Sequence, residues 1–316
     1  MAVGAAPRAS SATDRRPRGR RLGRGRATPY LFILPFGVLF VLFFLVPIAY
    51  AIIQSLYHAQ RSGLGLGGPP VTAFNGLGNY GDAFQDSAFY AGVGRVLLYG
   101  VVQVPVMLGG ALILALLMDS AAVRFKNFFR LAFFVPYAIP GVVGALLWTF
   151  LYDPQFSPVV AAIRGVGLRS FDFLGQDTIL WSIANIVTWE WMGYNMIIVF
   201  AALQAIPGEI YEAARMDGCT GLGVARHIKI PMVAPALVLT CVLSIIGTLQ
   251  TFTEPQILSG ISNNISSSYM PNVYAYNQAF NNNNYYYAAT LAVVLAVVTF
   301  VFSFGFLRLT QRQSGV

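Results

Sequence analysis

A polar stretch from Glu212 to Pro231 interrupts the apolar second half of the sequence. It carries five charged side chains, Glu212, Arg215, Asp217, Arg226 and Lys229. Capping rules predict a helix that begins at Pro207, a stop at Gly218, which can take the left-handed conformation, and a second helix that ends at Pro231. Because long apolar runs flank the stretch, we expect a short helical hairpin over residues 206–231 between two membrane spans.

The titratable residues form no catalytic or metal-binding pattern in the sequence. There are no paired carboxylates, no Ser/His/Asp arrangement and no metal-ligand spacing, since Cys219, Cys241, His58 and His227 are far apart. Neither cysteine suits a structural disulfide. No G-x-x-x-x-G-K-[ST] phosphate loop occurs, so the chain cannot hydrolyse ATP by that chemistry. We therefore expect no catalytic residue, no metal and no bound cofactor in this chain.

The polar stretch resembles the signature of binding-protein-dependent ABC importer permeases, E-A-A, three residues, G, nine residues, then I-x-L-P. The matching positions are Glu212, Ala213, Ala214, Gly218, Ile228 and Pro231, with Ile230 where Leu is usual. The resemblance implies that the hairpin docks on an ATP-binding-cassette subunit and couples it to transport. Ala213 and Ala214 would allow close docking, and Glu212 and Asp217 would pair with basic groups or brace the loop. The alternative is a hairpin lying on the membrane surface.

Polar side chains inside the apolar runs on either side of the hairpin form the second candidate site. Ionisable and amide groups are expensive in hydrocarbon and are functional candidates for that reason. Glu190 lies between two tryptophans, and either packs against a neighbouring helix or accepts a sugar hydroxyl. Gly247, Gln250 and Glu254 share one face if the second run is helical. The alternative, which we favour for Ser244 and Thr248, is ordinary hydrogen bonding between helices.

A further resemblance, to the maltose-type permease, implies a sugar site midway across the membrane. The corresponding positions are Trp189, Met192, Gly193 and Tyr194 before the hairpin, and Gln250, Thr251 and Phe252 after it. Gln-Thr replaces the relative's amide pair, so the class of site can carry over while the ligand differs. With the polar groups above, the predicted solute path is Trp189, Glu190, Met192, Gly193, Tyr194, Asn195, Gln250, Thr251, Phe252 and Glu254.

Composition places the chain in a bilayer, since 56% of its 316 residues are hydrophobic and 10% are charged. Six runs are long enough to cross about 30 Å of hydrocarbon: 31–57, 96–118, 131–152, 181–203, 233–258 and 288–307. We therefore expect an all-α integral membrane protein with six transmembrane helices. The prolines at 136 and 140 should kink the third.

Lysines and arginines gather in residues 1–28, in the loop after the second run, in the hairpin and at the C-terminus. The positive-inside rule therefore predicts that both termini and the hairpin are cytoplasmic. Residues 1–28 should be a disordered basic tail that lies near anionic membrane lipid, and residues 29–316 one permease domain. This distribution explains the net charge of +8 without nucleic acid.

Two shorter stretches resemble the sugar-permease subgroup: Gly76-Leu77-Gly78-Asn79-Tyr80, and the run from Phe133 to Pro140 that leads to Trp148. The glycine-rich segment at 63–68 lacks a preceding strand and a following helix, so we expect a flexible external loop and not a dinucleotide site. The segments 153–178 and 259–287 are also expected to be external loops.

The resemblance covers roughly Thr28 to the C-terminus and implies a type I, MetI-like ABC permease core that imports a sugar or oligosaccharide. The implied partners are a second homologous permease, a dimer of ATPase subunits that bind ATP and Mg²⁺, and an extracytoplasmic solute-binding protein. The implied location is the bacterial cytoplasmic membrane. The alternatives are an importer of glycerol-3-phosphate or a polyol, and an ion-coupled secondary transporter, which would not co-purify with an ATPase.

Overall fold

The computed structural model describes residues 28–60, 70–120, 123–165 and 172–314. The predicted tail, apart from Thr28, and the glycine-rich segment 63–68 lie outside the described residues. The chain divides into two compact units, Met1–Ala49 and Tyr50–Val316. The described part of the first unit is α1 (Thr28–Phe40), a π-helical turn (Val41–Leu45) and the start of α2 (Val46–Gln54). Pro47 follows the wide π turn, which accommodates a residue without an N–H.

The second unit is mostly helical. Its elements are β1 (Tyr57–Gln60), β2 (Val71–Phe74), α3 (Gly78–Ala83), α4 (Ser87–Asp119), α5 (Lys126–Ala138), α6 (Gly141–Tyr152), α7 (Pro158–Gly165), α8 (Ile179–Gln204), α9 (Gly208–Met216), α10 (Gly221–Val224), a π-helical turn (Ala225–Lys229), α11 (Ile230–Leu249), α12 (Thr253–Leu258), α13 (Pro271–Phe280) and α14 (Tyr285–Ser314). Across the described residues, five helices are long and apolar enough to cross a membrane, and the bent pair α5 and α6 makes a sixth if it counts as one crossing. On that count the prediction of six spans holds.

The third predicted span is broken and not merely kinked. Helices α5 and α6 meet at an angle of 98°. Ile139 between them is extended, with ψ of 131°, because a residue that precedes a proline is disfavoured in the helical region. Pro140 then caps α6. Pro140 therefore separates the span into two helices, whereas Pro136 lies inside α5.

The fifth predicted span lies within one candidate membrane crossing, Gly221–Leu258, but its helix is interrupted at residues 250–252. Helix α11 ends at Leu249, and Gln250 and Phe252 depart from helical geometry, Phe252 with φ of −142° and ψ of −49°. Helix α12 begins only at Thr253. As a result Gly247, Gln250 and Glu254 do not lie on one continuous helical face. Non-helical backbone at membrane depth is tolerated where it lines a cavity or is covered by protein.

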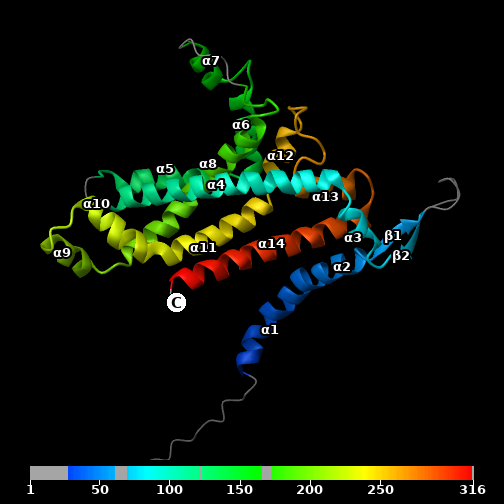
Figure 1. Ribbon diagram of the computed structural model, residues 1–316, viewed down its shortest axis with the longest axis horizontal. Coiled ribbons are helices and arrows are strands. Elements are labelled where there is room, and N and C mark those ends of the chain that lie inside the picture. The colour runs from blue at the N-terminus through cyan, green and yellow to red at the C-terminus, as the bar shows by residue number, and fades with distance from the viewer. Residues whose placement is uncertain (1–27, 61–69, 121–122, 166–171, 315–316) are drawn as a thin grey trace, which may run out of the picture. The chain divides into compact units, whose positions relative to one another are not determined.

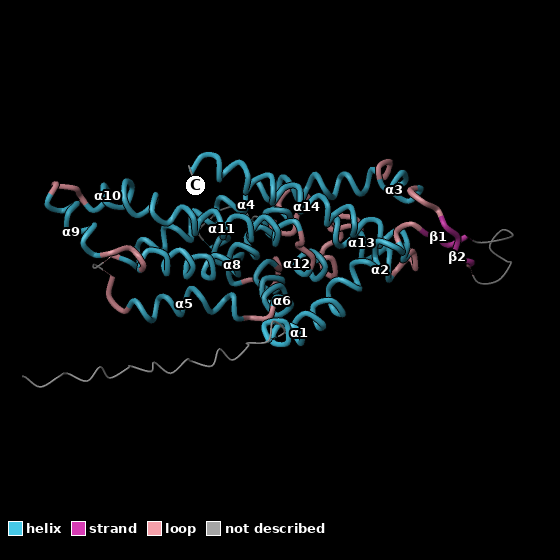
Figure 2. Tube along the Cα trace, turned by 90° about the horizontal axis from the view of Figure 1, so that it is seen from below, coloured by secondary structure: helices cyan, strands magenta, loops and turns pink. Residues whose placement is uncertain are grey.

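Helix α4 is the centre of the second unit and packs along α8 and against α11, as Figures 1 and 2 show. One buried cluster includes Tyr99, Ile183 and Leu249. A second, toward the hairpin end, includes Ala115, Leu203 and Val233. Small residues on α4 let the helices approach closely, which is the usual basis of helix packing in membranes.

The hairpin helices α9 and α10 and the strands β1 and β2 lie at opposite ends of the second unit (Figure 2). The strands pair antiparallel, which the sequence did not predict. Asn79, in the stretch similar to the sugar-permease subgroup, donates hydrogen bonds to the carbonyl oxygens of Ser55 (2.9 Å) and Tyr57 (2.6 Å). The Tyr80 hydroxyl lies 2.7 Å from that of Ser55. This stretch therefore fixes the end of α2 against α3.

Candidate functional site

The first helix of the hairpin, α9, ends at a turn that depends on glycine. Gly218 has φ of +79°, the left-handed value predicted for it. Its N–H bonds the Arg215 carbonyl at 3.1 Å, and the Cys219 N–H bonds the Ala214 carbonyl at 2.9 Å. These two bonds form a Schellman motif, which satisfies carbonyls left free at the end of α9. Thr220 then caps α10 by accepting the Gly223 N–H at 3.2 Å.

The prediction that Pro231 ends the second helix is wrong. The chain runs from α10 through the π-helical turn into α11, with Pro231 in the first turn of α11. The Ile230 N–H bonds the Ala225 carbonyl in the wider π pattern. Because the π turn shifts the hydrogen-bond register just before Pro231, the missing N–H breaks nothing. The hairpin therefore passes without interruption into the fifth span.

The predicted coupling residues differ in exposure. Glu212, Ala213, Asp217 and Pro231 are exposed, Ile228 is half-buried, and Ala214 is buried. Ala214 anchors α9, and the acidic side chains are left on the surface. An exposed face with two carboxylates and small residues suits close docking of another protein.

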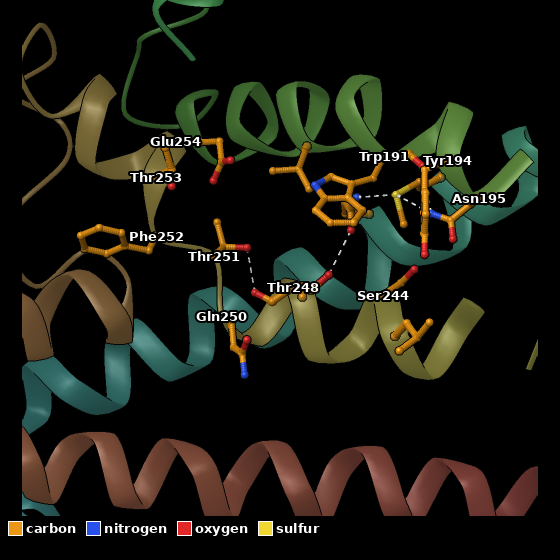
Figure 3. A pocket seen from close by; sticks show the side chains of 15 residues that line it. Trp191, Tyr194, Asn195, Ser244, Thr248, Gln250, Thr251, Phe252, Thr253 and Glu254 are labelled. Carbon is orange, nitrogen blue, oxygen red and sulfur yellow. Dashed lines mark hydrogen bonds between the residues drawn. The ribbon is translucent and has the colours of Figure 1, made fainter. Parts of the chain in front are cut away.

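A cavity of about 220 Å³ lies where span five is broken, between α4, α8 and α11 (Figure 3). The residues that line it are Gln103, Met107, Val187, Trp191, Tyr194, Asn195, Leu243, Ser244, Gly247, Thr248, Gln250, Thr251, Phe252, Thr253 and Glu254. None of these 15 residues is lysine or arginine. The wall thus offers amide, hydroxyl and carboxyl groups together with aromatic rings.

A hydrogen-bond bridge crosses the cavity wall. Gln103 of α4 donates from Nε2 to the Thr188 hydroxyl of α8 at 3.3 Å and accepts at Oε1 from the Thr248 hydroxyl of α11, also at 3.3 Å. The Thr251 hydroxyl donates to the Thr248 carbonyl at 2.8 Å, which satisfies backbone freed by the break. The Asn195 amide donates to the Trp191 carbonyl at 3.0 Å.

Six of the ten residues predicted for the solute path line this cavity: Tyr194, Asn195, Gln250, Thr251, Phe252 and Glu254. Four do not, and they support the wall from behind. Trp189 packs edge-on against Trp148, and Met192 fills the space at Gly110. Gly193 has its α-carbon against the Phe133 carbonyl, where a Cβ would lie 1.7 Å from the oxygen.

Glu190 is buried behind the cavity and does not line it. A Cβ on Gly144 of α6 would lie 2.4 Å from its Oε1, and that oxygen has no hydrogen-bond partner among the described residues. The Glu254 carboxyl, which does line the cavity, lies close enough to that of Glu190 for the two to interact.

The sequence reasoning missed Gln103, and it favoured ordinary helix packing for Ser244 and Thr248. A glutamine inside an apolar run was a usable signal, because buried amides in membrane helices need partners. Tyr137, from the broken third span, also contributes, since its ring stacks on that of Tyr194 with centroids 4.5 Å apart.

Comparison with known proteins places the chain among transport proteins. Residues 111–314 match the family described as binding-protein-dependent transport system inner membrane component. The chain is 32% identical over 286 residues to a probable ABC transporter permease protein, YurN, of Bacillus subtilis, covering 89% of this chain and 95% of that protein. It is also 32% identical over 283 residues to the lactose transport system permease protein LacF of Rhizobium radiobacter, covering 87% and 91%.

A solved structure with a similar fold is a chain of a bacterial ABC transporter involved in the import of the acidic polysaccharide alginate. The TM-score is 0.76 at 19% sequence identity, covering 90% of this chain and 95% of that chain. At this identity the likeness supports the fold and not the solute.

Proposed function

Since the chain belongs to the family of binding-protein-dependent transport system inner membrane components, we propose that its solute is a neutral sugar or oligosaccharide carried into the cytoplasm. The chain is a multi-pass membrane permease subunit of an ABC importer and not an enzyme, and a separate subunit hydrolyses ATP.

The composition of the cavity wall is the main support for a sugar as the solute. Sugars are bound through hydroxyl groups by amides and carboxyls, and through their apolar faces by aromatic rings. Gln250 and Glu254 provide such polar groups, and Trp191 and Tyr194 provide the rings. The name of the lactose relative supports the same class of solute.

A phosphate-bearing solute such as glycerol-3-phosphate fits this wall less well. Anion sites in proteins usually present arginine, lysine or a helix N-terminus to the charge. The residues that line the cavity include no arginine or lysine, and Glu254 would repel an anion. A neutral polyol satisfies the same polar groups and is tested together with the sugars.

A second permease subunit completes the site in this proposal. The cavity of about 220 Å³ is smaller than the roughly 300–1,000 Å³ of most small-molecule sites. A facing, homologous permease would supply the opposite wall. Discontinuous helices at such a boundary are where transporters commonly hold their solute.

The hairpin provides the coupling to ATP hydrolysis. Two ATPase subunits bind ATP and Mg²⁺, and each receives one hairpin through the exposed face at Glu212, Ala213 and Asp217. When the ATPases close, the hairpin draws α8 and α11 with it, because it is continuous with α11 and joined to α8 by only a few residues. A solute-binding protein delivers the solute from outside.

The orientation follows from charge. The C-terminus and the hairpin lie toward the same end of the second unit (Figure 1), and that end carries Arg124, Lys126 and Lys229. The positive-inside rule assigns it to the cytoplasm. We place the protein in the bacterial cytoplasmic membrane with both termini inside.

The test is uptake by proteoliposomes that contain the chain with its partner permease and ATPase, with ATP and Mg²⁺ on the ATPase side and the solute-binding protein on the other. A panel of labelled neutral sugars, polyols and glycerol-3-phosphate is offered. ATP-dependent uptake of a neutral sugar that Gln250→Ala and Glu254→Ala both reduce supports the proposal. Uptake of glycerol-3-phosphate alone, or uptake driven by an ion gradient without ATP, contradicts it.

A further inference from the structure

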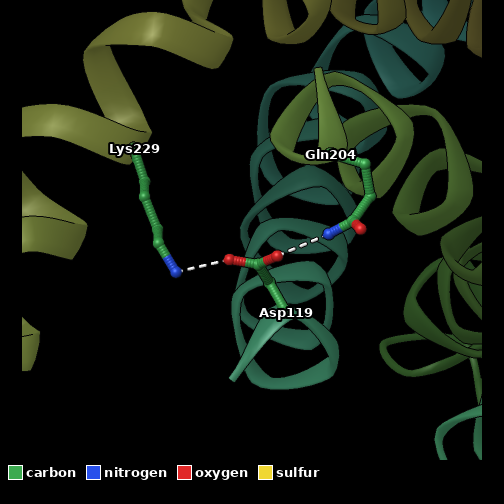
Figure 4. A network of polar contacts seen from close by, with 3 residues as sticks. All are labelled: Asp119, Gln204 and Lys229. Atoms are coloured by element: carbon green, nitrogen blue, oxygen red, sulfur yellow. Dashed lines mark hydrogen bonds and ion pairs between the residues drawn. The ribbon is translucent and has the colours of Figure 1, made fainter. Parts of the chain in front are cut away.

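One carboxylate at the hairpin end of the second unit bonds to both segments that connect the hairpin to the membrane helices. Asp119, the last residue of α4, accepts a hydrogen bond from Gln204 Nε2 at 2.6 Å and forms an ion pair with the Lys229 ammonium (Figure 4). Gln204 ends α8, and Lys229 ends the π-helical turn that leads into α11. We call Asp119, Gln204 and Lys229 the inner tie.

The charges in the inner tie are complementary. Asp119 sits at the C-terminal, negative end of a long helix that has no basic residue in its last turn. A carboxylate in that position is disfavoured unless a cation compensates it. Lys229 supplies that cation from the coupling segment, and both side chains are largely buried. The Lys229 ammonium also lies 5.2 Å from the ring centroid of Tyr211, which is on α9 beside Glu212.

A second tie joins the same three helices at the cavity. Gln103 of α4 bonds Thr188 of α8 and Thr248 of α11. Gln103 and Asp119 are 16 residues apart on one helix, which is about 24 Å along its axis at 1.5 Å per residue. Gln103 of α4 therefore bonds both α8 and α11 at the cavity. At the hairpin, Asp119 of α4 bonds the end of α8 and the π-helical turn that leads into α11.

From these two ties we propose that α4, α8 and α11 move as one rigid lever, and that Asp119 is the positioning residue that passes the displacement of the hairpin to α4. The covalent chain attaches the hairpin only to α8 and α11. Without the inner tie, only apolar packing would hold the hairpin end of α4 to α8 and α11, and movement of the hairpin could strain the bonds of Gln103 to Thr188 and Thr248. This inference rests on the proposed coupling role of the hairpin.

The experiment measures the separation of α4 and the hairpin in the assembled transporter. Spin labels are attached to the exposed native Cys219 and to a cysteine introduced at exposed Leu117, in a Cys241→Ala background. Distances are recorded without nucleotide and with AMP-PNP and Mg²⁺. We expect the same separation in both states for the chain with the tie intact, and a changed or broadened one for Asp119→Asn.

Coupling provides the second readout. Asp119→Asn and Lys229→Gln should lower solute uptake per ATP hydrolysed by about five-fold or more while the complex still assembles. Lys229→Arg, which keeps the cation, and the exchange of charges in Asp119→Lys with Lys229→Asp should recover part of the loss. Arg124→Gln, which removes an exposed charge from the loop after α4, is the matched control and should change neither readout.

The outcomes separate the two proposals. If the parent complex shows no ATP-driven uptake at all, the proposed function fails and the lever fails with it. If the parent transports and Asp119→Asn leaves both the label separation and the uptake per ATP unchanged, the lever is overturned while the function stands. A tie that served folding alone would lower yield and thermal stability and leave the uptake per ATP of the assembled complex unchanged, which also overturns it.

Discussion

The side-chain amide of Asn272 donates a hydrogen bond of 2.9 Å to the backbone carbonyl oxygen of Leu249. Leu249 is the last residue of α11, and Asn272 belongs to α13, 23 residues farther along the chain. The carbonyls in the last turn of a helix have no partner within it. Asn272 therefore supplies the donor that lets span five stop at the cavity.

Asn272→Ala should destabilise the protein because it leaves the Leu249 carbonyl without this donor. The expected loss is about 1–1.5 kcal/mol, the usual net value of one such hydrogen bond. Thermal unfolding of the purified complex in nanodiscs measures it. Asn282→Ala is the control, since the exposed Asn282 amide donates to the Gln278 side chain in the last turn of α13 and caps no span. Equal effects of the two substitutions would contradict the capping role.

The hairpin was predictable from sequence because its determinants are local. Gly218 takes the left-handed conformation and a helix follows it, both of which short-range capping rules predict. The same rules failed at Pro231, because a π-helical turn upstream shifts the hydrogen-bond register so that no N–H is needed at this position. A π turn has no sequence signal of its own here.

The broken fifth span had a sequence signal that was overlooked. Pro255, in the first turn of α12, has no N–H for the Thr251 carbonyl four residues earlier, and its ring crowds that carbonyl. Asn272 and the Thr251 hydroxyl then bond carbonyls at the end of α11, and these partners could not be predicted from sequence. Six path residues nevertheless line the cavity. The maltose-type resemblance located Tyr194 and the stretch from Gln250 to Phe252 without requiring a helix, and Asn195 and Glu254 were predicted as polar groups within apolar runs. Gln103 was missed because a lone amide in an apolar run does not reveal its partners.

Gly193→Ala should separate α5 from α8. The added Cβ would lie 1.7 Å from the Phe133 carbonyl oxygen, which is backbone and cannot rotate away. We expect a loss of about 1–3 kcal/mol, the usual cost of overpacking. Uptake should fall as well, because Tyr137 of α5 stacks on Tyr194 in the cavity wall.

The control for this substitution is Gly109→Ala, which also adds a methyl group within a membrane helix but meets nothing within 4 Å. The yield of assembled complex and its unfolding temperature are compared for the two variants. If both behave like the parent protein, the close approach of α5 and α8 at Gly193 is not required.

Asp86 joins three helices at the end of the second unit opposite the hairpin. Its Oδ1 caps α4 by accepting the Ala88 and Phe89 N–H groups, and its Oδ2 accepts the Tyr274 and Tyr287 hydroxyls at 2.7 Å each. Burial alone would raise the pKa of Asp86, but these four hydrogen bonds outweigh it and the pKa is lowered below its ordinary value.

A lowered pKa in the folded state makes this contribution dependent on pH. A carboxyl of this kind adds stability above its unfolded pKa of about 3.9, and the contribution is lost as pH falls through the folded value. Asp86→Asn should therefore unfold at a lower temperature than the parent near neutral pH, and the gap should shrink as pH falls below about 4. Unfolding temperatures across this range measure it, with Asp82→Asn, at an exposed position one turn earlier, as the control. A gap that is constant with pH would rule out the ionised carboxyl as its source.

Substitutions at Gly218 should weaken coupling in a graded order. With φ of +79°, the position penalises any Cβ by roughly 1–2 kcal/mol and a branched one most, while asparagine tolerates the left-handed region best. We expect ATPase recruitment and uptake to decrease from Gly to Asn to Ala to Val, because the turn between α9 and α10 sets the face that carries Glu212. Co-purification of the ATPase and uptake are measured together, and Glu212→Lys should reduce both without affecting the turn. Gly208→Ala, at the start of α9 with open space around it, is the control. If Val at 218 recruits the ATPase and transports as well as Gly, the hairpin geometry does not couple the two subunits.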